Sequence, residues 1–198
     1  MIEFVNTNSA EPYVRLRKIY KKALNSNQKA IEAISISSYS NKAKSVDSRF
    51  VNLKIVDNTD FIFFSNYNSP KAEQFQDSNK IAALIFWNEI NVQIRIKAHI
   101  KKTNEKFNNS YFYSRDLKKN ALAISSDQSQ KIESYDAVRN NYQEVLKSKN
   151  LKNCPKYWGG FSFKPYYFEF WEGNKNRINK REVYVNTNGC WKHSFLQP

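Results

Sequence analysis

The chain has 198 residues and carries 32 lysines and arginines against 18 aspartates and glutamates, which gives a formal net charge of +14. This length provides one substantial domain with its own core and is too short for two independent ones. A strongly basic chain could bind nucleic acid, but the lysines are spread along it among many asparagines, as a biased genomic base composition also produces. We favour the compositional origin and do not expect a nucleic-acid partner.

The cysteines and histidines form no metal-ligand pattern. Cys154 and Cys190 make no CxxC pair and have no ligand-like spacing to His99 or His193, so we expect neither a metal site nor a disulfide framework. The start, MIEFVNTNSAEPY, lacks a secretory signal, and the apolar run over 81–87 is far shorter than the ~20 residues that span a bilayer. We expect a soluble, cytoplasmic protein without a membrane partner.

The N-terminal half predicts one helix followed mostly by strands. Pro12 and the helical spacing of the apolar side chains after it predict an amphipathic helix over 11–25. Apolar runs separated by turn residues predict strands over 30–39, 48–57, 60–66, 80–90 and 91–102, with a short helix over 69–78.

The C-terminal half predicts helices over 107–115 and 134–149, then two hairpins from Trp158 onward. Consecutive strands with short links describe a mainly β, antiparallel sheet, which we expect to close into a barrel with flanking helices. The chain has neither a GxGxxG nor a P-loop motif, so side chains must hold any phosphate ligand.

The segment WGGFSFKPYYFEFWEGNKNRINKR, over 158–181, holds three of the four glycines. It predicts a strand that ends near Gly173 and a second strand that restarts at Arg177, which would place Arg177, Asn179 and Arg181 on one strand face. Such a face beside aromatic rings suits a planar anionic ligand, and it equally suits a solvated edge strand. The pattern alone leaves both interpretations open.

A set of short motifs occurs in a fixed order along the chain: RFVNLK, FFSN, SPKAEQ, VQIRI, YFYSR, DQS, YWGGF, FWEGNKNRINKR and the closing WKHSFLQP. In this order they resemble the pyridoxamine 5'-phosphate oxidase family, from about Ala30 to Pro198. The resemblance implies a homodimeric, FMN-binding split β-barrel that oxidises pyridoxamine or pyridoxine 5'-phosphate to pyridoxal 5'-phosphate with oxygen and releases hydrogen peroxide. Residues 1–198 would form a single domain, with 1–29 as an N-terminal segment and helix and 158–198 completing sites at the subunit interface.

The resemblance also implies roles for individual residues. It assigns the FMN shell to Arg49, Lys54, Phe64, Ser65, Lys71, Gln93, Gln128, Ser129, Trp171 and Arg181. It assigns the substrate to Lys54, Tyr111, Arg115, Lys119, Arg177 and Asn179, of which Arg177 and Asn179 would lie at the reacting ring.

Simple geometry tests some of these roles. Tyr111 and Arg115 are four residues apart, so they share one side of a helical turn and can grip one phosphate. Arg49 and Lys54 are an odd number of residues apart and would face opposite sides of a regular strand, so a shared centre requires a bend or two-sided access.

Several of these residues could instead have purely structural roles. Arg115 alone could be a solvated helix charge, and Gln93 could be an outward strand residue. Gln128 with Ser129 could cap the following helix, and Trp171 could be a core aromatic.

The chain departs from the family pattern at four places: Pro70 replaces an arginine beside the phosphate-binding lysine, Lys119 replaces a serine, Asn179 replaces a histidine, and the N-terminal segment lacks the family's arginine and tyrosine arm. FMN binding is therefore better supported than the substrate. The alternatives are a split-barrel FMN-binding protein or flavin reductase with another substrate and, last, a nucleic-acid-binding barrel.

Overall fold

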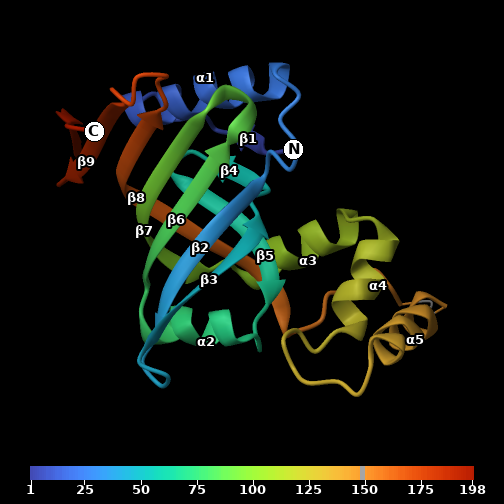
Figure 1. The fold of residues 1–198 in the computed structure, drawn as a ribbon. Coiled ribbons are helices and arrows are strands. Elements are labelled where there is room, and N and C mark those ends of the chain that lie inside the picture. The colour runs from blue at the N-terminus through green and yellow to red at the C-terminus, as the bar shows by residue number, and fades with distance from the viewer. Residues whose placement is uncertain (148–149) are drawn as a thin grey trace.

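The computed structural model describes residues 1–147 and 150–198. A large sheet forms the body, α1 and α2 cover its two ends, and α3, α4 and α5 form a helical lobe beside it (Figure 1). The strands are β1 Glu3–Val5, β2 Ala33–Ser40, β3 Ser45–Asn52, β4 Ile55–Asp57, β5 Asp60–Asn66, β6 Lys80–Trp87, β7 Val92–Lys102, β8 Trp158–Glu172, β9 Lys180–Thr187 and β10 Cys190–Leu196. The helices are α1 Glu11–Asn25, α2 Pro70–Asp77, the 3-10 helix η1 Asn88–Ile90, α3 Glu105–Ser114, α4 Leu117–Ser125 and α5 Tyr135–Leu146.

The strands follow the order β1-β4-β5-β8-β7-β6-β2-β3, with β9 on β8 and β10 on β9. All pairs are antiparallel except β1 with β4, and β1 was not predicted. Within the described residues β1 and β3, the two ends of this order, do not pair, so the expected closure into a continuous barrel is wrong. Along one edge β8 changes partner: its first part pairs with β5 and its last part with β9.

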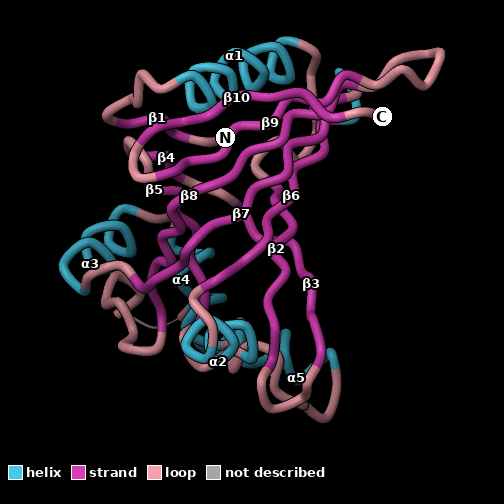
Figure 2. Tube along the Cα trace, turned by 90° about the vertical axis from the view of Figure 1, so that its left-hand side faces the viewer, coloured by secondary structure: helices cyan, strands magenta, loops and turns pink. Residues whose placement is uncertain are grey.

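Helix α1 occupies the predicted residues and lies along the sheet end, beside β10 in Figure 2. Its buried face includes Tyr13, whose ring contacts Phe61, Phe168 and Trp191 at centroid distances of 6.2, 5.4 and 5.9 Å. This aromatic contact attaches the helix to the core and explains the apolar spacing in its sequence.

A β-bulge lets both halves of β8 contribute to the core. Phe161 and Phe163 are buried at odd positions, whereas Phe168 and Phe170 are buried at even ones. The pairing with β7 skips Tyr166, and this extra residue reverses the alternation of side chains along the strand. As a result Trp171 leaves the core side and is half-buried, so its interpretation as a core aromatic is wrong.

The predicted strand over 48–57 is two strands. β3 pairs with β2, and after a break at Leu53 and Lys54 the chain continues as β4, which pairs with β5. Leu53 N–H donates to Glu32 O, and Lys54 N–H donates to Ile62 O. Arg49 and Lys54 therefore do not lie on one regular strand, so the alternation of side chains along a single strand does not apply to them.

The helical lobe also differs from the prediction. Helix α4 was missed, and α5 ends at Leu146, whereas the predicted helix reached 149 and its positions 148 and 149 lie outside the described residues. Among the residues that the structure describes, no helix is both long and apolar enough to cross a bilayer.

Candidate active site

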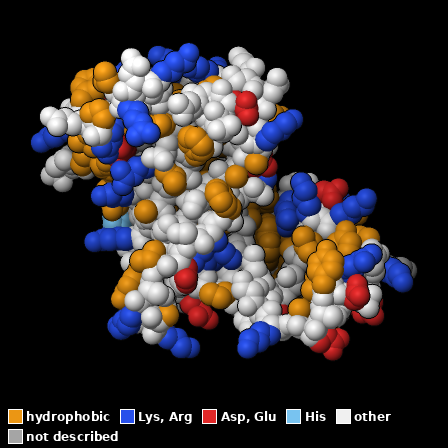
Figure 3. All heavy atoms as spheres, viewed as in Figure 1, with side chains coloured by type: hydrophobic (Ala, Val, Ile, Leu, Met, Phe, Trp, Pro, Cys, Tyr) orange, Lys and Arg blue, Asp and Glu red, His pale blue; other side chains and the backbone are white. Residues whose placement is uncertain are grey.

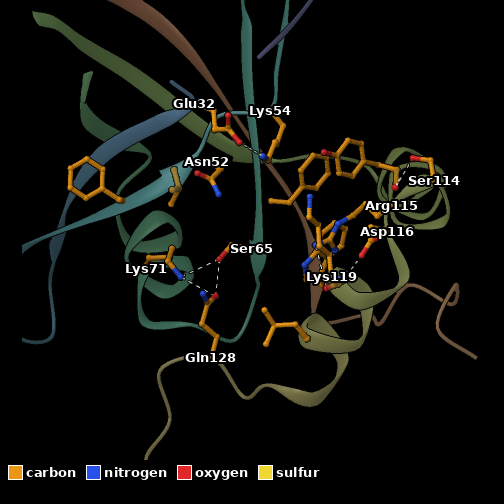
Figure 4. A pocket seen from close by; sticks show the side chains of 16 residues that line it. Glu32, Asn52, Lys54, Ser65, Lys71, Ser114, Arg115, Asp116, Lys119 and Gln128 are labelled. Atoms are coloured by element: carbon orange, nitrogen blue, oxygen red, sulfur yellow. Dashed lines mark hydrogen bonds and ion pairs between the residues drawn. The ribbon is translucent and has the colours of Figure 1, made fainter. Parts of the chain in front are cut away.

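A cavity of about 640 Å³ lies where the β3–β4 break and β5 meet α2, α3 and α4. This volume falls within the usual range for small-molecule sites, ~300–1,000 Å³. Figure 3 shows the hollow between the sheet and the helical lobe, and Figure 4 shows the side chains around the cavity. The lining residues are Glu32, Phe50, Val51, Asn52, Lys54, Phe64, Ser65, Lys71, Tyr111, Ser114, Arg115, Asp116, Lys119, Leu122, Gln128 and Trp158.

Lys71 stands on one side of this cavity, in the first turn of α2. Its side chain is buried and its Nζ lies 3.1 Å from each of Ser65 Oγ, Ser69 Oγ and Gln128 Oε1. Burial and the nearby charge of Arg49 lower the pKa of Lys71 to about 8. All three partners are neutral, so the ammonium group keeps a charge that an anionic ligand can neutralise.

Arg49 stands behind Lys71 and does not line the cavity. Its Nη1 donates to Ser38 Oγ at 2.6 Å and its Nη2 donates to Gln74 Oε1 at 2.9 Å. Burial lowers the pKa of the Arg49 guanidinium. Arg49 therefore contributes positive charge near Lys71 while protein atoms hold these two nitrogens.

Arg115 stands on the other side of the cavity, at the C-terminal cap of α3. Its guanidinium carbon lies 4.5 Å from the centre of the Trp158 ring, and its buried Nη1 has no hydrogen-bond partner among the described residues. Burial lowers the pKa of this guanidinium, which nevertheless stays charged. A buried donor without a partner is costly, so this nitrogen is well suited to an anionic acceptor.

Aromatic rings form the wall beside Arg115. Phe64 stacks on Tyr111 at a centroid distance of 3.7 Å and lies nearly parallel to Trp158 at 5.1 Å. Tyr111 and Arg115 share the cavity, as their spacing predicted. A Cβ atom on Gly159 would collide with Tyr67 and Asn108, so the glycine lets β8 approach closely and helps to place Trp158.

Lys54 and Lys119 add two further ammonium groups. Lys54 Nζ lies 2.8 Å from Glu32 Oε1. Hydrogen bonds from Lys54 and from the Met1 ammonium group lower the pKa of Glu32 to about 2. Lys119, on α4, lines the cavity without an ion pair to any acid of the described residues.

Gln128 and Ser129 lie in the turn after α4. Gln128 lines the cavity and accepts from Ser65 Oγ at 2.9 Å, whereas Ser129 is not among the lining residues. The helix-cap interpretation of both residues is wrong, because Ser134 caps α5 by accepting from the N–H of Ala137.

Three of the predicted FMN residues lie in a separate row across the sheet. Gln93 on β7 pairs with Trp171 on β8, which pairs with Arg181 on β9. The cavity residue Ser65 pairs instead with Gly159, twelve residues before Trp171 on β8. An extended strand of that length spans up to about 40 Å, so the row and the cavity lie toward opposite ends of β8.

Glu169 holds Arg181 in this row. The carboxylate is 2% exposed, accepts from Arg181 Nε at 2.9 Å and forms ion pairs of 2.8 Å with Arg181 and Arg95. Tyr167 OH donates to the same carboxylate at 2.9 Å. The positive charges of this region are thus already balanced in part within the protein.

The prediction for Arg177 and Asn179 is wrong in its geometry. β9 begins only at Lys180, and both residues lie in the turn before it. Arg177 has a left-handed φ of 60°, and Asn179 Oδ1 accepts from the N–H of Asn174. The two residues therefore do not share a strand face with Arg181, because local turn hydrogen bonds replace the strand.

Comparison with known proteins places the chain in a family. The pyridoxamine 5'-phosphate oxidase profile matches residues 21–149, and the pyridoxine 5'-phosphate oxidase C-terminal dimerisation region matches residues 158–198. The chain belongs to the pyridoxamine 5'-phosphate oxidase family. A pyridoxine/pyridoxamine 5'-phosphate oxidase 1 of Hydrogenovibrio crunogenus is 34% identical over 193 residues, 95% of this chain and 88% of that protein. An enzyme of this kind from Colwellia psychrerythraea is 35% identical over 170 residues, 84% of this chain and 77% of that protein.

Solved structures support the fold. PhzG from Burkholderia lata 383, in complex with tetrahydrophenazine-1-carboxylic acid, aligns with a TM-score of 0.89 at 23% identity and covers 95% of this chain and 93% of its own. A pyridoxamine 5'-phosphate oxidase-related, FMN binding protein of Nostoc punctiforme aligns with a TM-score of 0.79 at 11% identity, over 96% and 99% of the two chains. The fold is therefore that of the family's split barrel, with an open sheet.

The family's dimerisation region coincides with β8, β9 and β10. β8 carries Trp158 at the cavity and Trp171 in the distant row. Sequence reasoning did not assign a role to Trp158 or Glu32, although both line the cavity. The motif YWGGF contains Trp158 and could have indicated its role. No motif surrounds Glu32, because its partner Lys54 is distant in sequence.

Proposed function

We propose that this chain is an FMN-dependent oxidase that converts pyridoxamine or pyridoxine 5'-phosphate to pyridoxal 5'-phosphate with oxygen and releases hydrogen peroxide. One observation carries the proposal: Lys71 and Arg115 face one cavity from two sides, and neither forms an ion pair with a carboxylate of the described residues (Figure 4). Two cationic points suit a site that receives two phosphate groups, one from the cofactor and one from the substrate.

The residues present fit FMN. Lys71 would bind the FMN phosphate, supported by Ser65 and by the positive charge of Arg49. Phe64 and Gln128 would lie beside the cofactor, and Ser129 would contribute from the following turn. When bound, FMN would supply the hydride acceptor, which no amino-acid side chain provides.

A second copy of the chain would complete the site. Gln93, Trp171 and Arg181 lie too far along β8 for one FMN to reach both them and Lys71 within a single chain. The match of 158–198 to a dimerisation region supports a homodimer in which these residues serve the partner's cavity.

The chain's own groups would bind and orient the substrate. Arg115 and Tyr111 would hold its phosphate, with Lys54 and Lys119 adding positive charge, while the aromatic wall excludes water. Arg177 and Asn179, presented by the turn before β9, would approach the pyridine ring. Asn179 can donate and accept hydrogen bonds there but cannot carry a proton.

The test is to purify the protein, identify any released flavin and measure peroxide. We expect a yellow dimer that releases FMN on heating and produces peroxide with either phosphate ester but not with pyridoxine or pyridoxamine. A flavoprotein that produces no peroxide would instead be a family member with another substrate. Failure to bind FMN, together with salt-dependent retention of RNA, would contradict the flavoenzyme proposal altogether.

A further inference from the structure

Helix α3 connects the sheet to the rest of the helical lobe, with α4 and α5 beyond it (Figure 1). It leads from Asn108 through Tyr111 to Arg115, and the last two residues line the cavity. Helix α4 is attached to it by a hydrogen bond from Asn120 Nδ2 to Phe112 O at 2.9 Å. Among the residues that the structure describes, Asn108 is the one side chain of α3 that hydrogen-bonds to the strands or to the residues directly after them. The helix therefore has a single polar anchor on the sheet.

The amide of Asn108 uses both of its ends in this anchor. Its Oδ1 accepts from the N–H of Gly160 on β8 at 2.9 Å and from Thr103 Oγ1, just after β7, at 2.5 Å. Its Nδ2 donates to the hydroxyl of Tyr67, just after β5, at 3.0 Å, and Tyr67 OH donates in turn to Gly160 O at 3.0 Å. Asn108 is 5% exposed and does not line the cavity, so water does not compete for these bonds and a ligand in the cavity would not contact the amide.

Both glycines of the YWGGF motif make room for this network. A Cβ atom on Gly159 would lie 2.4 Å from Asn108 Nδ2, and one on Gly160 would lie 2.6 Å from Thr103 Oγ1. Both distances are too short for a real Cβ atom, so a side chain at either position would push the network apart. The glycines and the amide therefore form one arrangement that holds α3 against β8.

The anchor lies on the same side of α3 as the cavity residues, because Asn108 stands one turn before Tyr111 and two turns before Arg115. The other contacts on this side are made by rings: Tyr111 stacks on Phe64 at 3.7 Å, and the Arg115 guanidinium lies over Trp158 at 4.5 Å. Ring contacts tolerate sliding, because apolar attraction is not directional, whereas a hydrogen bond weakens steeply as its angle changes. The amide therefore supplies the directional constraint on the rotation of α3.

We propose that Asn108 is a positioning residue of the reaction: it fixes the rotation of α3 on the sheet, so that Tyr111 and Arg115 meet the substrate phosphate. The inference rests on the proposed function and adds a residue that lies outside the cavity. Arg115 Nη1 is buried without a partner among the described residues, so a small rotation of α3 would turn it away from the ligand. Asn108 acts only through the residues that it places.

The test uses the FMN-loaded protein and two probes that it cannot oxidise, 4-deoxypyridoxine 5'-phosphate and its unphosphorylated form, with affinities measured by calorimetry. Asn108→Leu keeps the approximate size of the side chain and removes its hydrogen bonds. It should weaken binding of the phosphate form about tenfold, because Arg115 loses its placement, and change the affinities for the unphosphorylated form and for FMN by less than about twofold. Tyr67→Phe, a milder change that removes the acceptor of Asn108 Nδ2, should weaken binding of the phosphate form alone by about threefold.

Two further measurements separate positioning from a merely structural role. Adding Asn108→Leu to Arg115→Ala should weaken binding of the phosphate form by no more than about twofold beyond Arg115→Ala alone, because Asn108 acts mainly through Arg115. Ser162→Ala is the matched control, since Ser162 is a buried residue of β8 whose Oγ donates to Asp60 Oδ1 at 2.5 Å and which does not line the cavity. Like Asn108→Leu, it should lower the unfolding temperature, but it should leave both probe affinities unchanged.

The outcomes are distinguishable. If wild type prefers the phosphate form but Asn108→Leu and Tyr67→Phe lower only the unfolding temperature, the inference is wrong and the proposed function stands. Equal losses for both probes, or a loss that adds fully to that of Arg115→Ala, would also overturn it. If Asn108→Leu does not fold, Tyr67→Phe, alone and combined with Arg115→Ala, decides between the same results. If wild type does not distinguish the two probes, both the inference and the proposed substrate are wrong.

Discussion

The cations near the two ends of β8 differ in whether a carboxylate of the protein pairs with them. At the cavity end, Lys71 and Arg115 are buried or half-buried without a carboxylate partner. At the other end, Arg95 and Arg181 share Glu169, a carboxylate that is almost completely buried. The comparison teaches that counting basic residues does not show how much charge is left for a ligand, because Glu169 already balances part of the charge of Arg95 and Arg181.

This difference makes separable predictions, since substitutions at the cavity should change ligand binding and substitutions at Glu169 should change stability.

Arg115→Ala should have the largest effect on the substrate. Loss of a guanidinium bound to phosphate should raise KM for the phosphate esters by about thirty- to a hundredfold, with a much smaller change in kcat because the phosphate is remote from the reacting carbon. Steady-state peroxide kinetics measure both constants. Arg139→Ala, an exposed arginine of α5, is the matched control, and an equal loss in that variant would contradict a specific role of Arg115.

Lys71→Met should weaken FMN binding about ten- to a hundredfold, and Arg49→Ala should weaken it less, because protein atoms already hold two of the Arg49 nitrogens. Fluorescence titration of FMN measures both affinities. If Arg49→Ala has the larger effect, Arg49 must reorient toward the phosphate in the complex.

The same lysine predicts a pH dependence. The pKa of Lys71 in the folded protein is about 8, below the ordinary lysine value of 10.5, so between these pH values the unfolded chain binds more protons than the folded chain. The free energy of unfolding of the FMN-free protein should therefore rise by up to about 3 kcal/mol between pH 8 and 10.5, relative to the Lys71→Met variant. Over the same pH range the affinity for FMN should fall, because Lys71 loses its charge. Denaturant unfolding of both proteins at several pH values tests the sign.

Glu169→Gln should destabilise the protein rather than weaken ligand binding at Arg115. It leaves Arg95 and Arg181 without their shared counter-charge, which should cost about 2 kcal/mol, less than a fully buried pair because Arg95 is half exposed. Thermal unfolding measures this loss, and KM for the phosphate esters should stay within about twofold. Glu172→Gln, which removes a more exposed carboxylate, is the control. A large rise in KM with unchanged stability would refute the structural role of Glu169.

Asn179→His should have the smallest effect. The residue lies in the turn before β9, so the substitution should leave FMN affinity unchanged and alter turnover by less than about threefold. Activity that appears only in this variant would show that wild type has a different substrate.

The sequence determined the elements whose signals are local. The spacing of apolar residues predicted α1 at its observed bounds, alternation and turn residues predicted β5, and the four-residue spacing of Tyr111 and Arg115 placed both in one cavity. Ordered motifs identified the family before any fold was known. These features survive because each depends on residues that are near one another in the chain.

Only the tertiary structure decided the features that depend on distant partners. The bulge at Tyr166 turned Trp171 away from the core, the break at Lys54 brought that residue to Glu32, and local turn bonds kept Arg177 and Asn179 out of β9. Sequence patterns could not identify Glu169 as the partner of Arg95, because a long helical insert separates β7 from β8. A sequence pattern fixes which residues can face one side, but strand pairing and packing select their neighbours, and the neighbours determine which charges remain available to a ligand.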